Sequence, residues 1–213
     1  MPKNHKFIPA LRFDWLTPLY DPILRWVMRE DQFKKELIQQ AELSPQQKVL
    51  DLGCGTATLT IMVKEAHPDA QVTGLDVDPK VLTIGQAKAM KAGVSISLDH
   101  DLSYALPYSD GAFDRVLSSL MFHHLTSQDK QQTLKEAYRV LKQDGRLCIV
   151  DFGPPVGLWA RIISPVMARL EEVGDHHKGL LPVMMQLAGF RNVSVRRRFA
   201  TVFGTLNLFV GLK

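Results

Sequence analysis

The sequence has little cysteine, no long apolar run and no strong excess of one charge. Its two cysteines, Cys54 and Cys148, are too few for a disulfide framework. No apolar run approaches the length of about 20 residues that crosses a bilayer. Residues 1–12 lack the apolar core and the small-residue cleavage site of a secretory signal. We therefore expect a protein of the reducing cytoplasm.

Metal-site patterns are also missing from the sequence. It contains no Cys-x-x-Cys or His-x-x-x-His spacing of the kind that holds zinc. Two pairs of adjacent histidines occur, His123-His124 and His176-His177, but neighbours on a strand point to opposite faces and chelate poorly. We expect no metal, and interpret these histidines as pocket bases, helix caps or surface groups.

Charge is nearly balanced overall but concentrated in places. Lys and Arg total 26 and Asp and Glu total 22, which leaves a net charge of +4. This falls short of the clustered excess of a dedicated nucleic-acid binder, so we do not expect a nucleic-acid partner. The densest group, Arg196-Arg197-Arg198, can protect an edge strand from aggregation. The alternative interpretation of these three arginines is that they attract an anionic membrane surface or RNA.

The apolar pattern predicts one α/β domain of 213 residues, with 46% hydrophobic and 23% charged residues. From Lys48 onward, apolar runs alternate with helical patterns, which is typical of a parallel sheet with crossover helices. Strands are predicted near residues 48–52, 71–76, 94–98, 113–119, 145–151, 192–198 and 202–211. Helices are predicted near residues 31–42, 57–66, 79–91, 129–142 and 178–188. Because the break at 199–201 is too short for a crossover, the last two strands are expected to pair antiparallel.

A glycine-rich turn follows the first predicted strand, in the run Val49 to Thr58. Gly53 and Gly55 allow a sharp turn that lies against a ligand, and Thr56 is expected to open a helix whose N-terminus receives an anion. Thr58 stands where a dinucleotide fingerprint has its third glycine. The acid ahead of the glycines, Asp51, would repel a pyrophosphate but suits a ligand that carries both an ammonium and a carboxylate. Taken alone, Asp51 can also be read as a capping or loop acid.

Two further acids follow at the ends of the next predicted strands. Asp76 lies 21 residues past Gly55, where a ribose diol is held, and Val77 beside it can pack on a purine. Asp101, after the third predicted strand, can accept from an adenine amino group, although aspartates are also common in turns. One acid for an ammonium, one for a ribose and one for an adenine together describe S-adenosylmethionine as the cofactor.

These residues resemble the class I S-adenosylmethionine-dependent methyltransferases over roughly residues 48–151. The resemblance includes the runs 113–119 and 139–147, and it implies a Rossmann-like sheet of seven strands, mostly parallel with an antiparallel last strand, helices on both faces and an N-terminal helical cap. It adds Leu102 and Ser119 to the expected cofactor contacts. The runs 188–190 and 209–213 are similar to the branch of C-methyltransferases that act in ubiquinone and menaquinone biosynthesis.

Two segments flank this predicted core. Residues 1–46 are expected to form a helical cap or lid, 47–152 the cofactor-binding half, and 153–213 the substrate-side helices and final hairpin. The resemblance implies that a Tyr-Asp pair in the first segment, here beginning at Tyr20, contributes to the substrate pocket. The stretch 153–177 is apolar and includes Trp159, which suits a greasy substrate or a membrane interface. His176 is a further candidate on the substrate side. The alternative for both segments, 1–46 and 153–177, is that they only cover the sheet.

Methyl transfer needs few reacting protein groups, because the donor is already activated and the enzyme mainly aligns donor and acceptor. A phenol or a ring carbon must nevertheless lose a proton. The candidate bases are His123 and His124, after the fourth predicted strand at the edge of the sheet where ligands gather. Asp151, at the end of the fifth predicted strand, is a candidate of similar standing.

The favoured reading is a methyltransferase that acts on a small lipophilic or aromatic acceptor, with a quinone-precursor ring carbon as the leading case. An RNA or protein methyltransferase is the alternative within the enzymes. A different class is a protein that binds S-adenosylmethionine, or serves as a scaffold, without turnover. A nicotinamide dehydrogenase is disfavoured by Asp51 and by the lack of a separate catalytic domain. The oligomeric state stays open.

Overall fold

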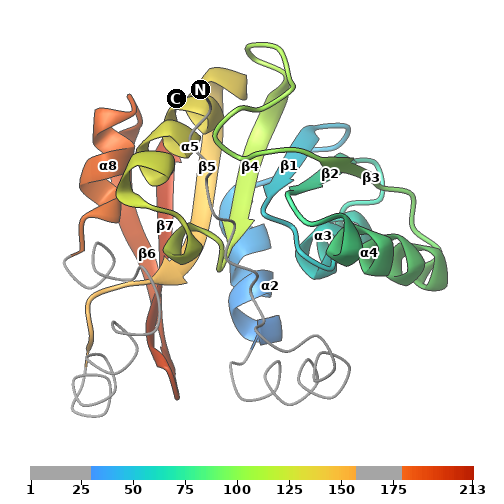
Figure 1. The fold of residues 1–213 in the computed structure, drawn as a ribbon, viewed down its shortest axis with the longest axis horizontal. Helices are drawn as coiled ribbons and strands as arrows, with labels where there is room; N and C mark the ends of the chain where they lie inside the picture. Colours follow the sequence, from blue (N-terminus) through green and yellow to red (C-terminus); the bar gives the residue numbers. More distant parts are fainter. Residues whose placement is uncertain (1–29, 157–178) are drawn as a thin grey trace, which may run out of the picture.

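A computed structural model describes residues 30–156 and 179–213, and these residues form a seven-stranded sheet in the order β3-β2-β1-β4-β5-β7-β6 (Figure 1). The strands are β1 (Lys48–Leu52), β2 (Gln71–Asp76), β3 (Ser97–His100), β4 (Phe113–Ser119), β5 (Leu141–Phe152), β6 (Arg191–Thr201) and β7 (Gly204–Leu212). Strands β1 to β5 pair in parallel, whereas β7 runs antiparallel to both β5 and β6. The predicted fold class and the antiparallel pairing of the last two strands are confirmed.

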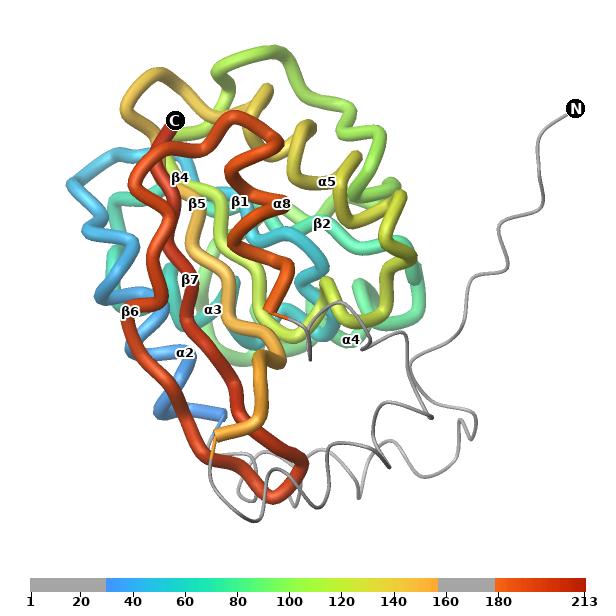
Figure 2. Tube along the Cα trace, turned by 90° about the vertical axis from the view of Figure 1, so that its left-hand side faces the viewer, coloured from blue at the N-terminus to red at the C-terminus, as the bar shows by residue number. Residues whose placement is uncertain are grey.

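Helices cover both faces of the sheet (Figure 2). They are α2 (Glu30–Ala41), α3 (Thr58–Ala66), α4 (Pro79–Ala92), α5 (Ser127–Val140) and α8 (Leu181–Leu187), with a 3₁₀ turn, η1, at Phe122–His124. On one face, Phe33 of α2 and Leu59 of α3 are buried in the same apolar cluster as Val49 of β1 and alternate residues of β5. On the other face, Leu134 of α5 and Met185 of α8 pack over the intervening strand residues. The parallel strands therefore bury both faces, as their continuous apolar runs predict.

The predicted boundaries of the third strand, the fifth strand and the final hairpin differ from the structure. The third strand begins at Ser97 rather than at residue 94, because α4 ends on a left-handed Gly93 and Val94 then donates its N–H to Ala89. The fifth strand begins at Leu141 and takes over the end of the helix predicted at 129–142, which instead spans Ser127–Val140. The break between the last strands lies at residues 202–203, not 199–201.

The division of the chain into a cap, a cofactor half and a substrate half stays a prediction. Of the expected cap, α2 lies against the sheet, where the guanidinium groups of Arg115 and Arg146 hold its C-terminal carbonyls at Ala41 and Gln40. The remainder of the cap, residues 1–29, lies outside the described residues, as does most of the stretch 153–177. None of the helices in the described ranges is long and apolar enough to span a membrane.

Candidate active site

The glycine turn between β1 and α3 is pinned to the end of β2. The N–H groups of Gly53 and Cys54 donate to the carbonyl of Leu75, at 2.9 and 3.0 Å. Gly53 has a φ of 72°, and a Cβ there would lie 2.2 Å from Cγ of Met121. Gly55 has a φ of 53°, but a Cβ there would meet nothing within 4 Å in the described structure. The turn is therefore packed on the Gly53 side and open on the Gly55 side, which leaves room for a ligand to approach the backbone.

Thr56 does not open the helix, contrary to the expectation from the sequence. Helix α3 begins at Thr58, because Ala57 adopts a left-handed conformation with a φ of 58° and its N–H closes a turn onto Cys54. The hydroxyls of Thr56 and Thr58 both accept hydrogen bonds from the ammonium of Lys88, at 3.0 and 2.6 Å. Thr56 thus lies within the turn, where Lys88 adds positive charge.

Asp51 lies almost fully buried beneath this turn, with 1% of its surface exposed. Its Oδ2 accepts a hydrogen bond of 2.6 Å from the hydroxyl of Thr60, whereas its Oδ1 has no partner among the described residues. Desolvation raises the pKa of the carboxyl from 3.8 to about 6, and the Thr60 hydrogen bond opposes this rise. A buried carboxylate with one unsatisfied oxygen can receive a cation from a ligand.

Asp76 is held in place by the backbone around it. Its Oδ2 accepts from the N–H of Gly55 at 2.8 Å, and its Oδ1 accepts from the N–H of Asp78 at 3.0 Å. Each carboxylate oxygen has a second lone pair, so the group keeps capacity for a diol. The acid therefore links the end of β2 to the open side of the glycine turn.

The third acid lies at the same edge of the sheet. The N–H of Asp101 donates to the carbonyl of Asp76 at 3.2 Å, and Oδ1 of Asp101 accepts from the N–H of Leu102 at 2.8 Å. Leu102 is exposed, and the carbonyl of Val77 contacts the ring of His100 at 2.9 Å. The structure thus brings Asp51, Asp76 and Asp101 together at the carboxyl ends of three adjacent parallel strands, although the third strand ends later than predicted.

A histidine–aspartate pair lies at the ends of β4 and β5, beside this edge. Nδ1 of His123 lies 2.8 Å from Oδ1 of Asp151, and the His123 N–H reaches Oδ2 at 3.3 Å. The N–H of Phe152 also donates to Asp151 at 2.7 Å. His123 is 5% exposed and Asp151 is fully buried. A carboxylate that orients an imidazole in this way favours the tautomer whose other nitrogen, Nε2, can accept a proton.

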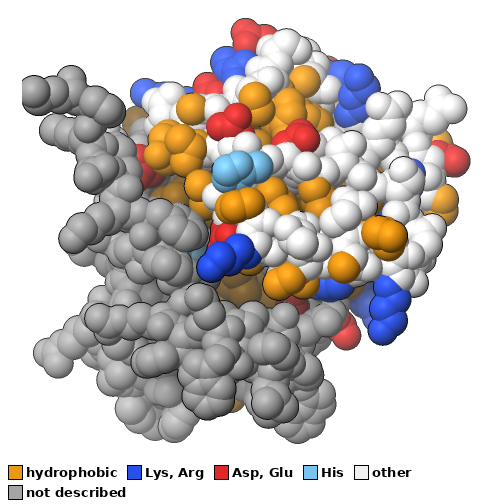
Figure 3. Space-filling view, turned by 45° about the vertical axis from the view of Figure 1, so that its right-hand side comes forward, with side chains coloured by type: hydrophobic (Ala, Val, Ile, Leu, Met, Phe, Trp, Pro, Cys, Tyr) orange, Lys and Arg blue, Asp and Glu red, His pale blue; other side chains and the backbone are white. Residues whose placement is uncertain are grey.

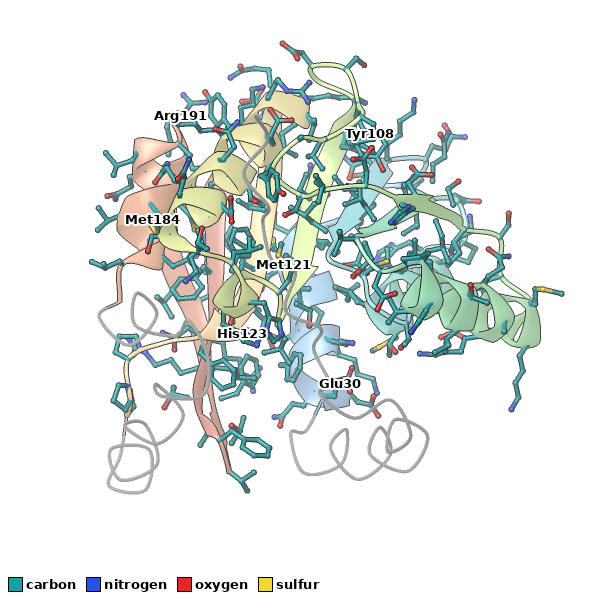
Figure 4. All side chains as sticks on the ribbon, viewed as in Figure 1. Glu30, Tyr108, Met121, His123, Met184 and Arg191 are labelled. Carbon is teal, nitrogen blue, oxygen red and sulfur yellow. The ribbon has the colours of Figure 1, made fainter. Side chains whose placement is uncertain are left out.

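His124 has different surroundings. Its ring packs on that of His123 with a centroid separation of 3.9 Å, but the residue is exposed. Desolvation, and then the neighbouring His123, lower the pKa of His124, an effect that solvent screens in part at an exposed residue. His123 is therefore the stronger candidate base of the two. Figure 4 shows His123 and Met121 close to the carboxyl end of β4.

The other candidates from the sequence are placed as follows. Ser119 ends β4, the strand between β1 and β5, and pairs with Val150 of β5. Tyr20, Trp159 and His176 lie outside the described residues. In the part of the chain that the structure describes, no three histidine, cysteine or acidic side chains form a group that could hold a metal.

Three residues near the site have no signal in the sequence. Thr60, in the first turn of α3, donates its hydroxyl hydrogen bond to Asp51. Lys34, buried on α2 and paired with Glu30, lies close enough to Asp51 to lower the pKa of its carboxyl. Asn207 of β7 is buried at the end of the sheet. Each of the three depends on contacts across the fold, which spacing along the chain does not reveal.

One face of the molecule shows histidine surface bordered by hydrophobic and acidic side chains (Figure 3). Basic side chains on this face are scattered and do not form a continuous stripe. A groove that follows a nucleic-acid backbone requires clustered positive charge. The described part of this face shows no such cluster (Figure 3).

Comparison with known proteins finds similarity to methyltransferases. Residues 49–145 match the model of a family described as a methyltransferase domain. A protein of Thermus thermophilus named demethylmenaquinone methyltransferase is 35% identical over 148 residues, which cover 68% of this chain and 63% of that protein. The protein of that name in Listeria welshimeri is 32% identical over 158 residues, 71% of this chain and 66% of that one. These matches span slightly less than two thirds of either relative's length.

A longer match and two solved structures extend the likeness. The demethylmenaquinone methyltransferase of Deinococcus radiodurans is 28% identical over 224 residues, which cover 94% of this chain and 90% of that protein. The structure of an S-adenosylmethionine-dependent methyltransferase from Aquifex aeolicus superposes with a TM-score of 0.66 at 20% identity, over 95% of this chain and all of that one. A putative methyltransferase from Bacillus halodurans gives 0.65 at 18% identity, over 84% and 98%. At these identities the two structures support the fold alone.

Proposed function

We propose that the chain is an S-adenosylmethionine-dependent methyltransferase and that it transfers a methyl group to a small lipophilic or aromatic acceptor, with a quinone-precursor ring carbon as the favoured case. The observation that carries the acceptor class is the buried His123–Asp151 pair at the ends of β4 and β5. A buried base suits an acceptor that must lose a proton. The names of the relatives, which refer to a demethylated quinone, support the same class.

The cofactor of the family fits the residues at the glycine turn. The unpartnered Oδ1 of Asp51 suits the ammonium of the methionine moiety, and the open side of Gly55 admits the ligand to the backbone. Asp76 is proposed to hold the ribose and Asp101 the adenine amino group. Val77, Leu102, Thr56 and Ser119 complete the proposed contacts. S-adenosylmethionine supplies a methyl group on a positively charged sulfur, so that a new bond to the methyl forms as the carbon–sulfur bond breaks and a neutral thioether leaves.

The protein's own contribution is to position the acceptor and to move a proton. His123, held by Asp151 through Nδ1, takes the proton of a ring hydroxyl at Nε2. The oxygen's electron pair then makes the neighbouring ring carbon nucleophilic as it meets the methyl group. The ring C–H proton then leaves to water while the ring oxygen takes back the proton held at Nε2 of His123, which restores both the aromatic ring and the neutral base. Asp151 stabilises the imidazolium that forms, because its carboxylate is buried against it.

The test is turnover of a defined acceptor. The purified protein is incubated with S-adenosylmethionine and a reduced naphthoquinone that lacks its ring methyl, and mass spectrometry locates the added methyl. We expect methylation at a ring carbon, and a fall in kcat of about 10²- to 10⁴-fold in His123→Ala. The matched control is His67→Ala, which removes a histidine at the far end of α3 and is expected to retain wild-type kcat.

Three outcomes would count against the proposal in different ways. Binding of S-adenosylmethionine without turnover of quinols, phenols or lipids would favour the non-catalytic alternative. Methylation of RNA or protein instead would replace the acceptor class. Wild-type kcat in His123→Ala would leave the acceptor class in place and remove His123 as the base.

A further inference from the structure

Asn207 carries a buried amide with an unsatisfied oxygen. The residue is 3% exposed, and its Oδ1 has no hydrogen-bond partner among the described residues. Within residues 30–156 and 179–213, only Asp51 Oδ1 shares this condition among buried side-chain nitrogen and oxygen atoms. Such an atom costs about 1–3 kcal/mol of stability. The oxygen of Asp51 is proposed to receive the ammonium of the cofactor, so the oxygen of Asn207 needs an explanation of the same kind.

The position of Asn207 places it beside the proposed base. In the antiparallel pairing of β5 and β7, Asn207 lies directly opposite Asp151, the partner of His123. Side chains of opposed residues in such a pair stand on the same face, with Cβ atoms about 4.5–5.5 Å apart. The amide therefore lies at the carboxyl end of β5, next to the pair that would receive the acceptor's proton.

Neighbouring residues make room for this amide without satisfying it. A Cβ on Gly153 would lie 2.1 Å from Nδ2 of Asn207, so the side chain occupies space that only a glycine leaves. Two residues along the same face of β7, the side chain of Thr205 does have a partner, since its hydroxyl accepts from the N–H of Val156 at 3.0 Å. The unsatisfied oxygen is thus particular to Asn207 and is not a general feature of the strand end.

We propose that Asn207 determines acceptor specificity by accepting a hydrogen bond from a second hydroxyl of the acceptor ring, while His123 takes the proton of the first. This inference rests on the proposed function and names the acceptor more narrowly, as a dihydroxylated aromatic ring. An amide oxygen seeks a donor, which a reduced quinone offers and an oxidised quinone does not. A buried polar group built to meet a hydroxyl rejects analogues that lack it, because the group is then left unpaired.

The experiment compares two acceptors in two proteins. The acceptors are 1,4-dihydroxynaphthalene and its monomethyl ether, which lacks the second hydroxyl. Wild type is expected to prefer the diol by at least tenfold in kcat/KM. Asn207→Leu, which keeps the side-chain volume and removes the oxygen, is expected to raise KM for the diol 10- to 100-fold and to reduce the preference to within twofold. The Kd for S-adenosylmethionine should stay within twofold of wild type.

Two further readouts separate recognition from a structural role. Because Asn207→Leu removes an unsatisfied buried oxygen, its Tm without ligand should equal or exceed that of wild type. The control Thr205→Val removes a satisfied hydroxyl two residues away, so it should lower Tm while keeping the preference for the diol. A fall in the Tm of Asn207→Leu together with lost cofactor binding would assign Asn207 a structural role and overturn the proposal.

The remaining outcomes distinguish this inference from the function beneath it. Wild-type turnover with an unchanged preference in Asn207→Leu would overturn the role of Asn207 and leave the methyltransferase proposal standing. No turnover of either naphthol by wild type, with intact cofactor binding, would overturn the acceptor class and the role of Asn207 with it.

Discussion

The raised pKa of Asp51 makes cofactor affinity depend on pH in a direction that can be worked out. Desolvation raises the pKa of this buried carboxyl from 3.8 to about 6. Only the charged form attracts an ammonium, so a ligand that brings one binds the deprotonated protein. The charged fraction falls from about 90% at pH 7 to about 10% at pH 5, and the apparent Kd should rise about tenfold, or ~1.4 kcal/mol.

The raised pKa of Asp51 also makes the stability of the ligand-free protein depend on pH. A carboxyl whose folded pKa lies above its unfolded value binds more protons when folded, so its charged form lowers stability as the pH rises through that range. Two pKa units correspond to about 3 kcal/mol at pH 7. Asp51→Asn should therefore raise the Tm of the ligand-free protein at pH 7 while it weakens cofactor binding.

The assay is calorimetric titration with S-adenosylmethionine from pH 5 to pH 7, in buffers of different ionisation enthalpy. Wild type should release up to one proton on binding below pH 6. Asp51→Asn is the control, because the titration of the cofactor itself is common to both proteins and cancels in their difference. In Thr60→Val, the midpoint of the curve of cofactor affinity against pH should move to higher pH, because the Thr60 hydroxyl lowers the pKa of Asp51. If the affinity for S-adenosylmethionine changed with pH equally in wild type and Asp51→Asn, the assignment of the ammonium to Asp51 would be refuted.

Four further predictions concern the same edge of the sheet. Asp76→Ala should weaken S-adenosylmethionine binding by ~1–3 kcal/mol in calorimetry, and unchanged affinity would contradict the ribose assignment. Gly53→Ala should lower Tm by several degrees, because the new Cβ would lie 2.2 Å from Cγ of Met121. A Tm equal to that of wild type would show that the Met121 side chain moves away without cost. Gly55→Ala should reduce cofactor affinity more than tenfold with a smaller loss of Tm, since the space there is open; retained affinity would mean that no ligand approaches. His124→Ala should reduce kcat less than His123→Ala does, and the reverse order would exchange their roles.

Most of the fold was predictable because it rests on local signals. The run from Asp51 to Gly55 contains a strand end and a turn within five residues, and Asp76 follows at the spacing of one helix and one strand. The third strand was predicted too early because Val94 and Ile96 are apolar. In the structure these residues pack beside α3 and α4 before the strand begins.

The acceptor side was less predictable because its contacts join distant parts of the chain. His123 and Asp151 were each candidates from their positions at strand ends, but their pairing spans 28 residues. Asn207 had no signal, since its meaning depends on the register that sets it opposite Asp151. A polar residue in an apolar strand indicates a binding site only once the structure shows that its neighbours leave it without a hydrogen-bond partner.

The place of β7 in the sheet has a consequence for the order in which the protein can be built during synthesis. β7 follows both β5 and β6 in the chain, yet it lies between them. The edge of β5 therefore stays open until β7 has left the ribosome, whereas β1 to β4, with the glycine turn and Asp76, can pair long before. A nascent chain can thus acquire its cofactor side first. Its acceptor side, where Asn207 lies opposite Asp151, forms only with the final hairpin, so the edge of β5 stays unpaired until late in synthesis.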